Sequence, residues 1–110
     1  MDKNTVAAVM AFLSSALQKS GLRVEKLVLF GSQAKDCARE DSDIDVIVVS
    51  PDFRDKDIFQ RVELTAEVDR DTVRKFVVPV DLILMTPEEY ESQTSPIAVY
   101  ARESGAVYAP

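Results

Sequence analysis

Three aspartates carry the clearest chemical signal in this sequence. Asp43 and Asp45 open one very apolar segment, and Asp81 lies inside another, Phe76 to Met85. Side chains two residues apart on a strand point to the same side, so Asp43 and Asp45 share a face. If the two segments are neighbouring strands, the three carboxylates converge, and their repulsion favours a bound divalent cation. Ligands that are all oxygen atoms favour Mg²⁺ or Mn²⁺ over Zn²⁺ or Cu²⁺.

A Gly-Ser turn precedes the aspartate pair by ten residues. Gly31 and Ser32 follow the apolar run Lys26 to Phe30, and a helical turn is expected after them. Free backbone N–H groups at such a turn favour a phosphate, and Lys35 is a further candidate to contact it. No Gly-Lys-Ser/Thr follows, so this is not a Walker P-loop. Together, the turn and the aspartates predict a site for a metal–nucleotide complex.

Each of these residues also has an ordinary structural interpretation. An isolated pair such as Asp43 and Asp45 is often a helix cap or a salt-bridged strand entry, and Lys35 could be a solvated surface charge. Asp41, Asp43 and Asp45 also resemble the start of a calcium-binding EF-hand loop. That loop needs a glycine and a later glutamate, whereas an apolar strand follows here, so calcium is excluded.

The composition excludes several classes of protein. The 110 residues are 46% apolar and 29% charged, which predicts one soluble globular domain spanning 1–110. The net charge of −6 argues against direct nucleic-acid binding. Histidine is absent, which removes Ser-His-Asp and Cys-His catalysis and most zinc sites. The single cysteine, Cys37, suggests a reducing compartment, and no segment is long enough to span a membrane, so a cytoplasmic location is expected.

The elements that must position these residues follow from periodicity and capping signals. Strands are expected at 26–30, 43–49, 76–85 and 106–108. Helices are expected from a cap at Asn4 or Thr5 to about Lys19, from Ile58 to about Lys75, from a cap at Thr86, and from near Pro96 to Glu103. Pro79 lacks a backbone donor, so the start of its strand is expected at a sheet edge or a bulge. The second helix is expected to pack through an apolar stripe of Ile58, Val62, Thr65, Ala66 and Val73. This order predicts an α/β (α+β) fold, a small mixed β-sheet with helices packed on it.

Gly31-Ser32, ten residues, then Asp43-x-Asp45, with Asp81 farther on, resemble the signature of the minimal nucleotidyltransferases of the DNA polymerase β-like superfamily. The resemblance covers most of the chain. It implies transfer of a nucleoside monophosphate, with ATP as the expected donor, to an acceptor hydroxyl. It also implies two Mg²⁺ or Mn²⁺ ions on Asp43 and Asp45, with Asp81 completing the ion site that activates the hydroxyl. Ser32 and the backbone near Gly31 would hold phosphates.

The resemblance also implies a partner. The chain leaves no room for a separate acceptor-binding domain, so the acceptor site is expected from a partner protein or from a homo-oligomer. Stand-alone minimal nucleotidyltransferases resemble the antitoxins of two-component systems whose partner is a HEPN-domain ribonuclease. The reaction that this resemblance implies is adenylylation of a tyrosine on that partner. Two other interpretations stay open. One is an antitoxin that acts by binding alone, motivated by Gln33 and Asp36, where the family often has a basic residue and a glycine. The other is transfer to a small molecule such as an aminoglycoside.

Overall fold

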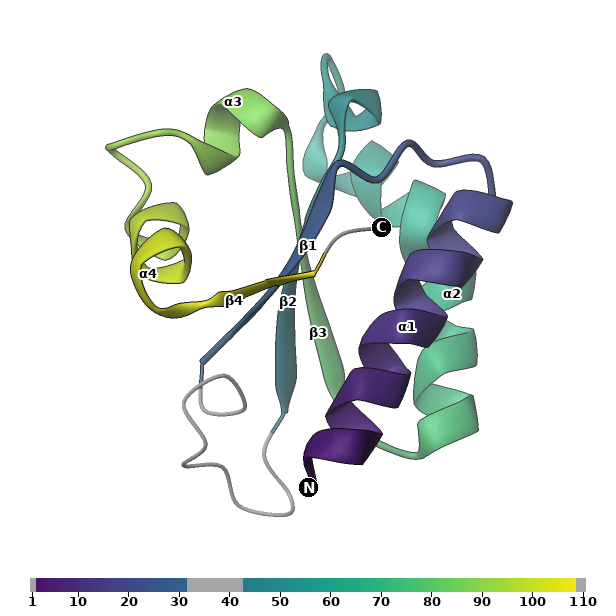
Figure 1. Cartoon of the computed structure of the whole chain (residues 1–110). Helices are drawn as coiled ribbons and strands as arrows, with labels where there is room; N and C mark the ends of the chain where they lie inside the picture. The colour runs from purple at the N-terminus through teal and green to yellow at the C-terminus, as the bar shows by residue number, and fades with distance from the viewer. Residues whose placement is uncertain (1, 32–42, 109–110) are drawn as a thin grey trace.

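A computed structural model of the chain describes residues 2–31 and 43–108 (Figure 1). The elements in chain order are α1 (Lys3–Lys19), β1 (Lys26–Phe30), β2 (Ile44–Val49), the 3-10 turn η1 (Pro51–Phe53), α2 (Ile58–Phe76), β3 (Val80–Met85), α3 (Pro87–Tyr90), α4 (Pro96–Ser104) and β4 (Ala106–Tyr108). The expected fold class is confirmed: the strands form a small mixed sheet, and helices pack on it. None of the helices described is long and apolar enough to cross a membrane.

The sheet has the order β3-β2-β1-β4. β1 is antiparallel to both of its neighbours, whereas β2 and β3 are parallel and are joined by α2. A parallel pair needs such a crossover, and here α2 supplies it. The strand order makes β3 an edge strand, as expected from the position of Pro79. The Pro79 carbonyl accepts a hydrogen bond from the Ile44 N–H at 2.9 Å.

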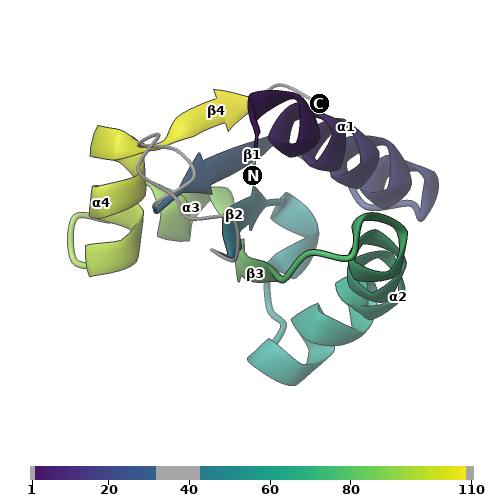
Figure 2. The ribbon, with the colours of Figure 1, turned by 90° about the horizontal axis from the view of Figure 1, so that it is seen from below.

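Helices cover both faces of this sheet (Figure 2). α1 and α2 lie on one face, and α3 and α4 lie on the other. The strands alternate between the two layers, because successive side chains point to opposite faces. On the side of α1 and α2 the buried strand residues are Leu27, Leu29, Ile44, Val46 and Val48. On the side of α3 and α4 they are Val28, Phe30, Ile47, Val49 and Met85.

Two predicted boundaries are wrong. The cap of α1 is Asp2 rather than Asn4 or Thr5, so the helix begins at Lys3; the Asp2 carboxylate accepts a hydrogen bond from the Thr5 N–H at 2.7 Å. The third strand begins at Val80 rather than at Phe76. α2 continues to Phe76, whose ring packs on Phe12 at 5.7 Å between centroids, and the strand can start only after Pro79.

The apolar stripe predicted to pack α2 on the sheet is also wrong for most of its members. Ile58, Val62 and Val73 are 69%, 48% and 39% exposed. The buried side chains of α2 are Thr65, Val68 and Thr72, of which only Thr65 was in the predicted stripe. The Thr72 hydroxyl donates to the Val68 carbonyl at 2.7 Å, which satisfies its polar atom inside the core. The helix therefore has two adjacent faces able to pack, and the more polar one covers the sheet.

Arg61 joins α2 to three other segments. Its guanidinium donates to both carboxylate oxygens of Glu89 in α3, at 2.6 and 3.2 Å, and to the Leu84 carbonyl of β3 at 3.1 Å. The same group lies over the Phe53 ring of η1 at 5.9 Å. The Arg61 side chain is only 14% exposed, so this contact is partly shielded from water. The hydrogen bond from Arg61 lowers the pKa of Glu89 from its ordinary value of 4.5.

We predict that Arg61→Met lowers the free energy of unfolding at pH 7 by about 1–2 kcal/mol, because charge-assisted hydrogen bonds are lost. A lowered carboxyl pKa stabilises the fold above the unfolded pKa, and this contribution is lost as the pH falls through the folded value. The deficit should therefore shrink below about pH 4.5. Urea unfolding followed by circular dichroism measures both effects. Arg54→Met, which breaks the exposed pair with Glu88, is the control and should change stability less.

Candidate functional site

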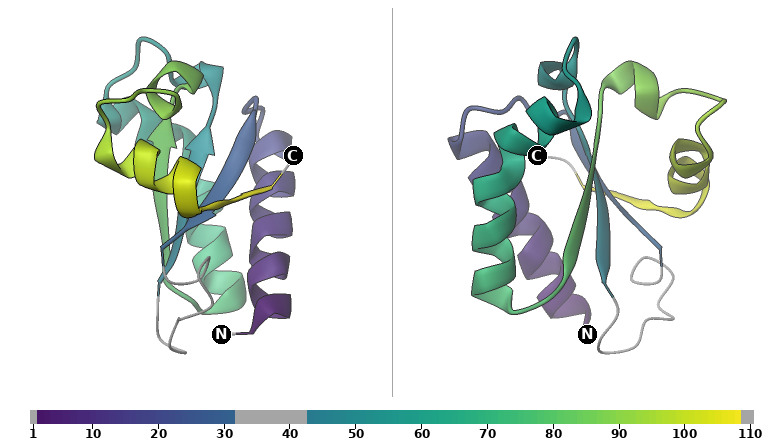
Figure 3. Two further views of the ribbon diagram at one scale, coloured as in Figure 1. Left: turned by 60° about the vertical axis from the view of Figure 1, so that its left-hand side comes forward. Right: turned by 180° about the vertical axis from the view of Figure 1, so that it is seen from behind.

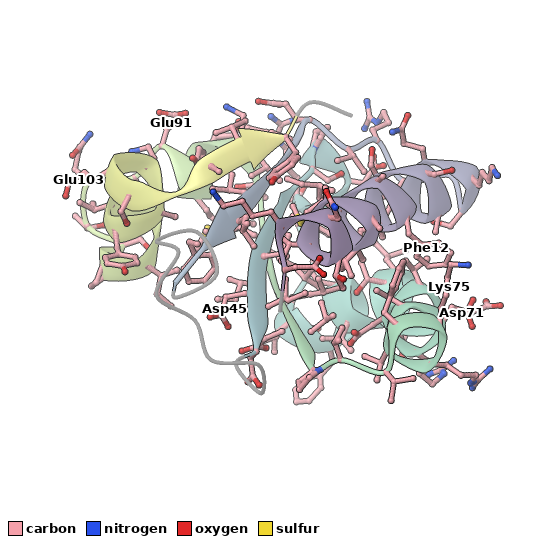
Figure 4. The ribbon with its side chains drawn as sticks, turned by 60° about the horizontal axis from the view of Figure 1, so that its bottom comes forward. Phe12, Asp45, Asp71, Lys75, Glu91 and Glu103 are labelled. Atoms are coloured by element: carbon pink, nitrogen blue, oxygen red, sulfur yellow. The ribbon has the colours of Figure 1, made fainter. Side chains whose placement is uncertain are left out.

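The candidate carboxylates lie at the start of the parallel strand pair. Asp45 and Asp81 are directly opposite each other in the register of β2 and β3, and Asp43 immediately precedes Ile44, the first residue of β2. Asp45 projects from β2 on the side away from α1 and α2 (Figure 4). It shares that face with Ile47 and Val49, as the alternation along a strand requires. The prediction that the two aspartate-bearing segments pair side by side is confirmed.

The three carboxylates act on one another electrostatically. Burial of Asp45 raises its pKa from the ordinary value of 3.8, and the charges of Asp81 and Asp43 raise it further. Asp45 is half-buried, whereas Asp43 and Asp81 are exposed. Asp81 is exposed because β3 is an edge strand and Asp81 is near its start, although its neighbours in the sequence are apolar. In the absence of a cation, the site disfavours ionisation of its central carboxylate.

The donor chemistry of this site fits an oxygen-preferring divalent ion. Its side chains offer carboxylate oxygens alone, and Asp45 carries the repulsion that a cation would relieve. Among residues 2–31 and 43–108, no three His, Cys, Asp or Glu side chains are grouped so that they could hold a metal ion. Backbone register places Asp45 opposite Asp81, and Asp43 directly precedes β2, but the three side chains are not among such groups.

Gly31 lies directly against Asp45 on the side of β1, opposite β3. Phe30 is the β1 partner of Asp45, and the chain then turns at Gly31 with φ of +76°. A Cβ atom at Gly31 would lie 2.6 Å from Asp45 Oδ2, so a side chain there would displace the carboxylate. Both the backbone conformation and the close approach require glycine. The predicted phosphate-binding residues Ser32 and Lys35 lie outside the described residues, as do Gln33, Asp36, Cys37 and Asp41.

Asp69 of α2 is a fourth carboxylate near the site, and the sequence alone did not identify it as a candidate. Burial raises its pKa, and the charge of Asp81 raises it further, while Arg70 lowers it. One of its oxygens is buried and has no hydrogen-bond partner among the described residues. A signal was present in the sequence: Asp69 lies four residues after Thr65 and three before Thr72. Both of those residues are buried, so Asp69 borders the packed face of the helix.

A cleft of about 550 Å³ lies where the end of α2 meets the start of β3. Its lining combines acidic, basic and apolar side chains: Asp43, Asp69, Arg70, Val73, Arg74, Pro79, Val80 and Asp81. It therefore contains two of the three candidate carboxylates. Another hollow, of about 580 Å³, lies along α1, and its lining contains no acidic side chain. The cleft beside β3 is the one that adjoins the candidate chemistry.

Comparison with known proteins identifies a family. Residues 9–104 match the model of the nucleotidyltransferase domain family, which is most of the chain. No curated protein matches the sequence.

Solved structures share the fold. One is a protein of Sulfolobus solfataricus described provisionally as a nucleotidyltransferase, with a TM-score of 0.55 at 20% identity, covering 98% of this chain and 88% of that one. A toxin–antitoxin complex with AMP-PNP gives a TM-score of 0.61 at 19% identity, covering 100% of this chain and 75% of the other. A mutant of the toxin–antitoxin complex MntA–HpeT gives 0.58 at 17% identity with the same coverages.

The family match covers the elements that position the aspartates, from α1 through β1, β2, α2 and β3 to α4. The carboxylates at the start of the parallel strands and the glycine turn against Asp45 lie within this match. The chain therefore belongs to the nucleotidyltransferase domain family, and the protein is a nucleotidyltransferase.

Proposed function

We propose that this nucleotidyltransferase transfers AMP from ATP to a tyrosine hydroxyl of a HEPN-domain partner, and that it acts in this way as the antitoxin of a toxin–antitoxin pair in the cytoplasm. The observation that carries the proposal is the meeting of Asp43, Asp45 and Asp81 at the start of two parallel strands. Two similar solved structures are toxin–antitoxin complexes, and one of them contains AMP-PNP, an ATP analogue. The other complex is a mutant in which two aspartates are replaced by glutamate. One residue separates those two aspartates, as one residue separates Asp43 from Asp45.

In this reaction the acceptor oxygen attacks the α-phosphorus of ATP. The bond from that phosphorus to the oxygen bridging the α- and β-phosphates breaks, and pyrophosphate leaves with the electron pair. Asp81 accepts the proton of the hydroxyl. Asp43 and Asp45 would hold the divalent ions, and Asp81 would complete the ion site nearest the acceptor. Bound Mg²⁺ or Mn²⁺ supplies the positive charge that stabilises the phosphates and the attacking oxygen.

The sheet order suggests how the two substrates are arranged. Gly31 at the end of β1 and Asp81 on β3 lie on opposite sides of Asp45, because β2 runs between β1 and β3. The turn at Gly31, with Ser32 and Lys35 after it, would hold the β- and γ-phosphates. The acceptor would then approach from the β3 edge, where Asp81 is exposed. The α-phosphate between them would lie against Asp45.

We predict that Asp43→Asn and Asp81→Asn each reduce transfer at least about 100-fold, because each removes a charge that acts on the reacting groups. The assay incubates the protein with ATP labelled at the α-phosphate, Mg²⁺ and the product of the adjacent gene as the candidate HEPN partner, and measures label on that product. Asp71→Asn, on the exposed side of α2, is the control.

Full labelling by either variant would contradict the proposal. The same assay separates the alternatives. A tight complex without label would indicate an antitoxin that acts by binding alone. Label on an aminoglycoside without any protein partner would indicate a small-molecule nucleotidyltransferase.

We also predict that Gly31→Ala reduces transfer by at least about tenfold, because its Cβ would displace Asp45 Oδ2 from the site. Gly21→Ala is a matched control: Gly21 also has a positive φ, +97°, but a Cβ there would meet no atom within 4 Å. Both variants should lose some stability through backbone strain. Only Gly31→Ala should slow the initial rate of labelling once both proteins are shown to be folded by circular dichroism. Equal rates for the two variants would contradict this role of Gly31.

A further inference from the structure

The outer side of α2 exposes an aligned set of apolar side chains. We define the α2 stripe as Ile58, Phe59, Val62, Ala66 and Val73. Phe59 is 77% exposed and Ile58 69%, while Ala66 is half-buried. At 100° per residue the five positions fall within one sector of about 100°, next to the buried face. Ile58, Phe59, Val62 and Ala66 span about 12 Å along the axis, and Asp69 lies in the same sector between Ala66 and Val73. Single exposed apolar residues are ordinary, but an aligned set of this length marks a contact surface.

The α2 stripe leads into the cleft that contains the candidate carboxylates. Val73 belongs to both, and it lines the cleft together with Asp81 and Pro79. The chain turns from the end of α2 directly into β3, so the helix and the edge strand form adjacent walls (Figure 3). Whatever lies along the stripe can therefore reach Asp81 without crossing the nucleotide side of the site at Gly31.

We propose that the α2 stripe and the cleft form the docking surface for the acceptor protein, whose hydroxyl-bearing side chain enters the cleft beside Asp81. This rests on the proposed function, because it assigns the acceptor of that reaction. An aligned apolar helix face beside a polar cleft suits a protein segment with an apolar face better than it suits a polar antibiotic or a nucleotide. The volume of the cleft, about 550 Å³, is in the range of sites that enclose a ligand group.

The polar lining of the cleft also suits a polypeptide. Arg70 and Arg74 contribute guanidinium groups, which bind carbonyls and carboxylates through paired hydrogen bonds. Arg74 makes only a loose contact with Asp71, at 3.9 Å. Asp69 contributes a carboxylate whose buried oxygen has no hydrogen-bond partner among the described residues.

The test measures binding and transfer separately. We would replace Val62 or Phe59 by glutamate, since both lie on the stripe outside the lining of the cleft. Val107→Glu is the matched control: Val107 is 61% exposed on β4, at the opposite edge of the sheet, and the change adds the same charge. Isothermal titration calorimetry measures affinity for the product of the adjacent gene, as the candidate HEPN protein. A fluorescent ATP analogue reports nucleotide binding, and labelling of the HEPN protein reports transfer.

We expect Val62→Glu and Phe59→Glu to weaken binding of the HEPN protein at least tenfold, while Val107→Glu and nucleotide binding stay unchanged. The docking surface would stand, and the proposed reaction would fail, if the wild type bound the partner through the stripe without labelling it. Equal affinity of all variants would overturn the docking surface, whether or not transfer occurs. A wild type that does not bind the HEPN protein would also overturn the docking surface. A stripe variant that only dissociates a homodimer in sedimentation velocity would overturn it too.

Discussion

Burial of Asp45, together with its repulsion by Asp81 and Asp43, is the constraint on which the site depends. It exists because β2 and β3 are parallel and in a register that places Asp45 opposite Asp81. A shift of one residue would move Asp81 to the other face of the sheet and would separate the charges. α2 makes this register possible, since a parallel pair needs a crossover of that length. The cost of gathering these charges in the free protein is the physical argument for a cation in the working enzyme.

In the proposed reaction, the same arrangement would separate the nucleotide side of the site from the acceptor side. Asp45 is on an inner strand, with Gly31 against it from β1 and Asp81 beside it on the edge strand β3. Glycine at position 31 lets the Asp45 carboxylate occupy the space that a Cβ would fill. The exposed edge leaves Asp81 open to an acceptor. α2 would then have two roles: its buried face holds the strand register, and its exposed stripe would bind the partner.

Much of this structure could be predicted from the sequence, because strong local signals determine it. The run Lys26 to Phe30 and the Thr86 capping box were placed correctly from apolar runs and capping residues. The packing face of α2 was not predicted correctly, because its more apolar stripe is exposed while Thr65 and Thr72 are buried. Periodicity finds apolar faces but does not decide which of two adjacent faces the sheet covers. Asp69 was missed for the same reason, because its place near Asp81 depends on how α2 is rotated.

The most direct test of the central claim measures stability with and without Mg²⁺ for the wild type and Asp45→Asn. A raised carboxyl pKa favours the fold below the unfolded value of 3.8, and this contribution is lost as the pH rises through the folded value, so at pH 7 ionised Asp45 costs stability. We predict that without metal Asp45→Asn is the more stable protein. Mg²⁺ at about ten times its dissociation constant should stabilise the wild type by about 1.4 kcal/mol and the variant much less. An equal response of both proteins, or none in the wild type, would contradict the account.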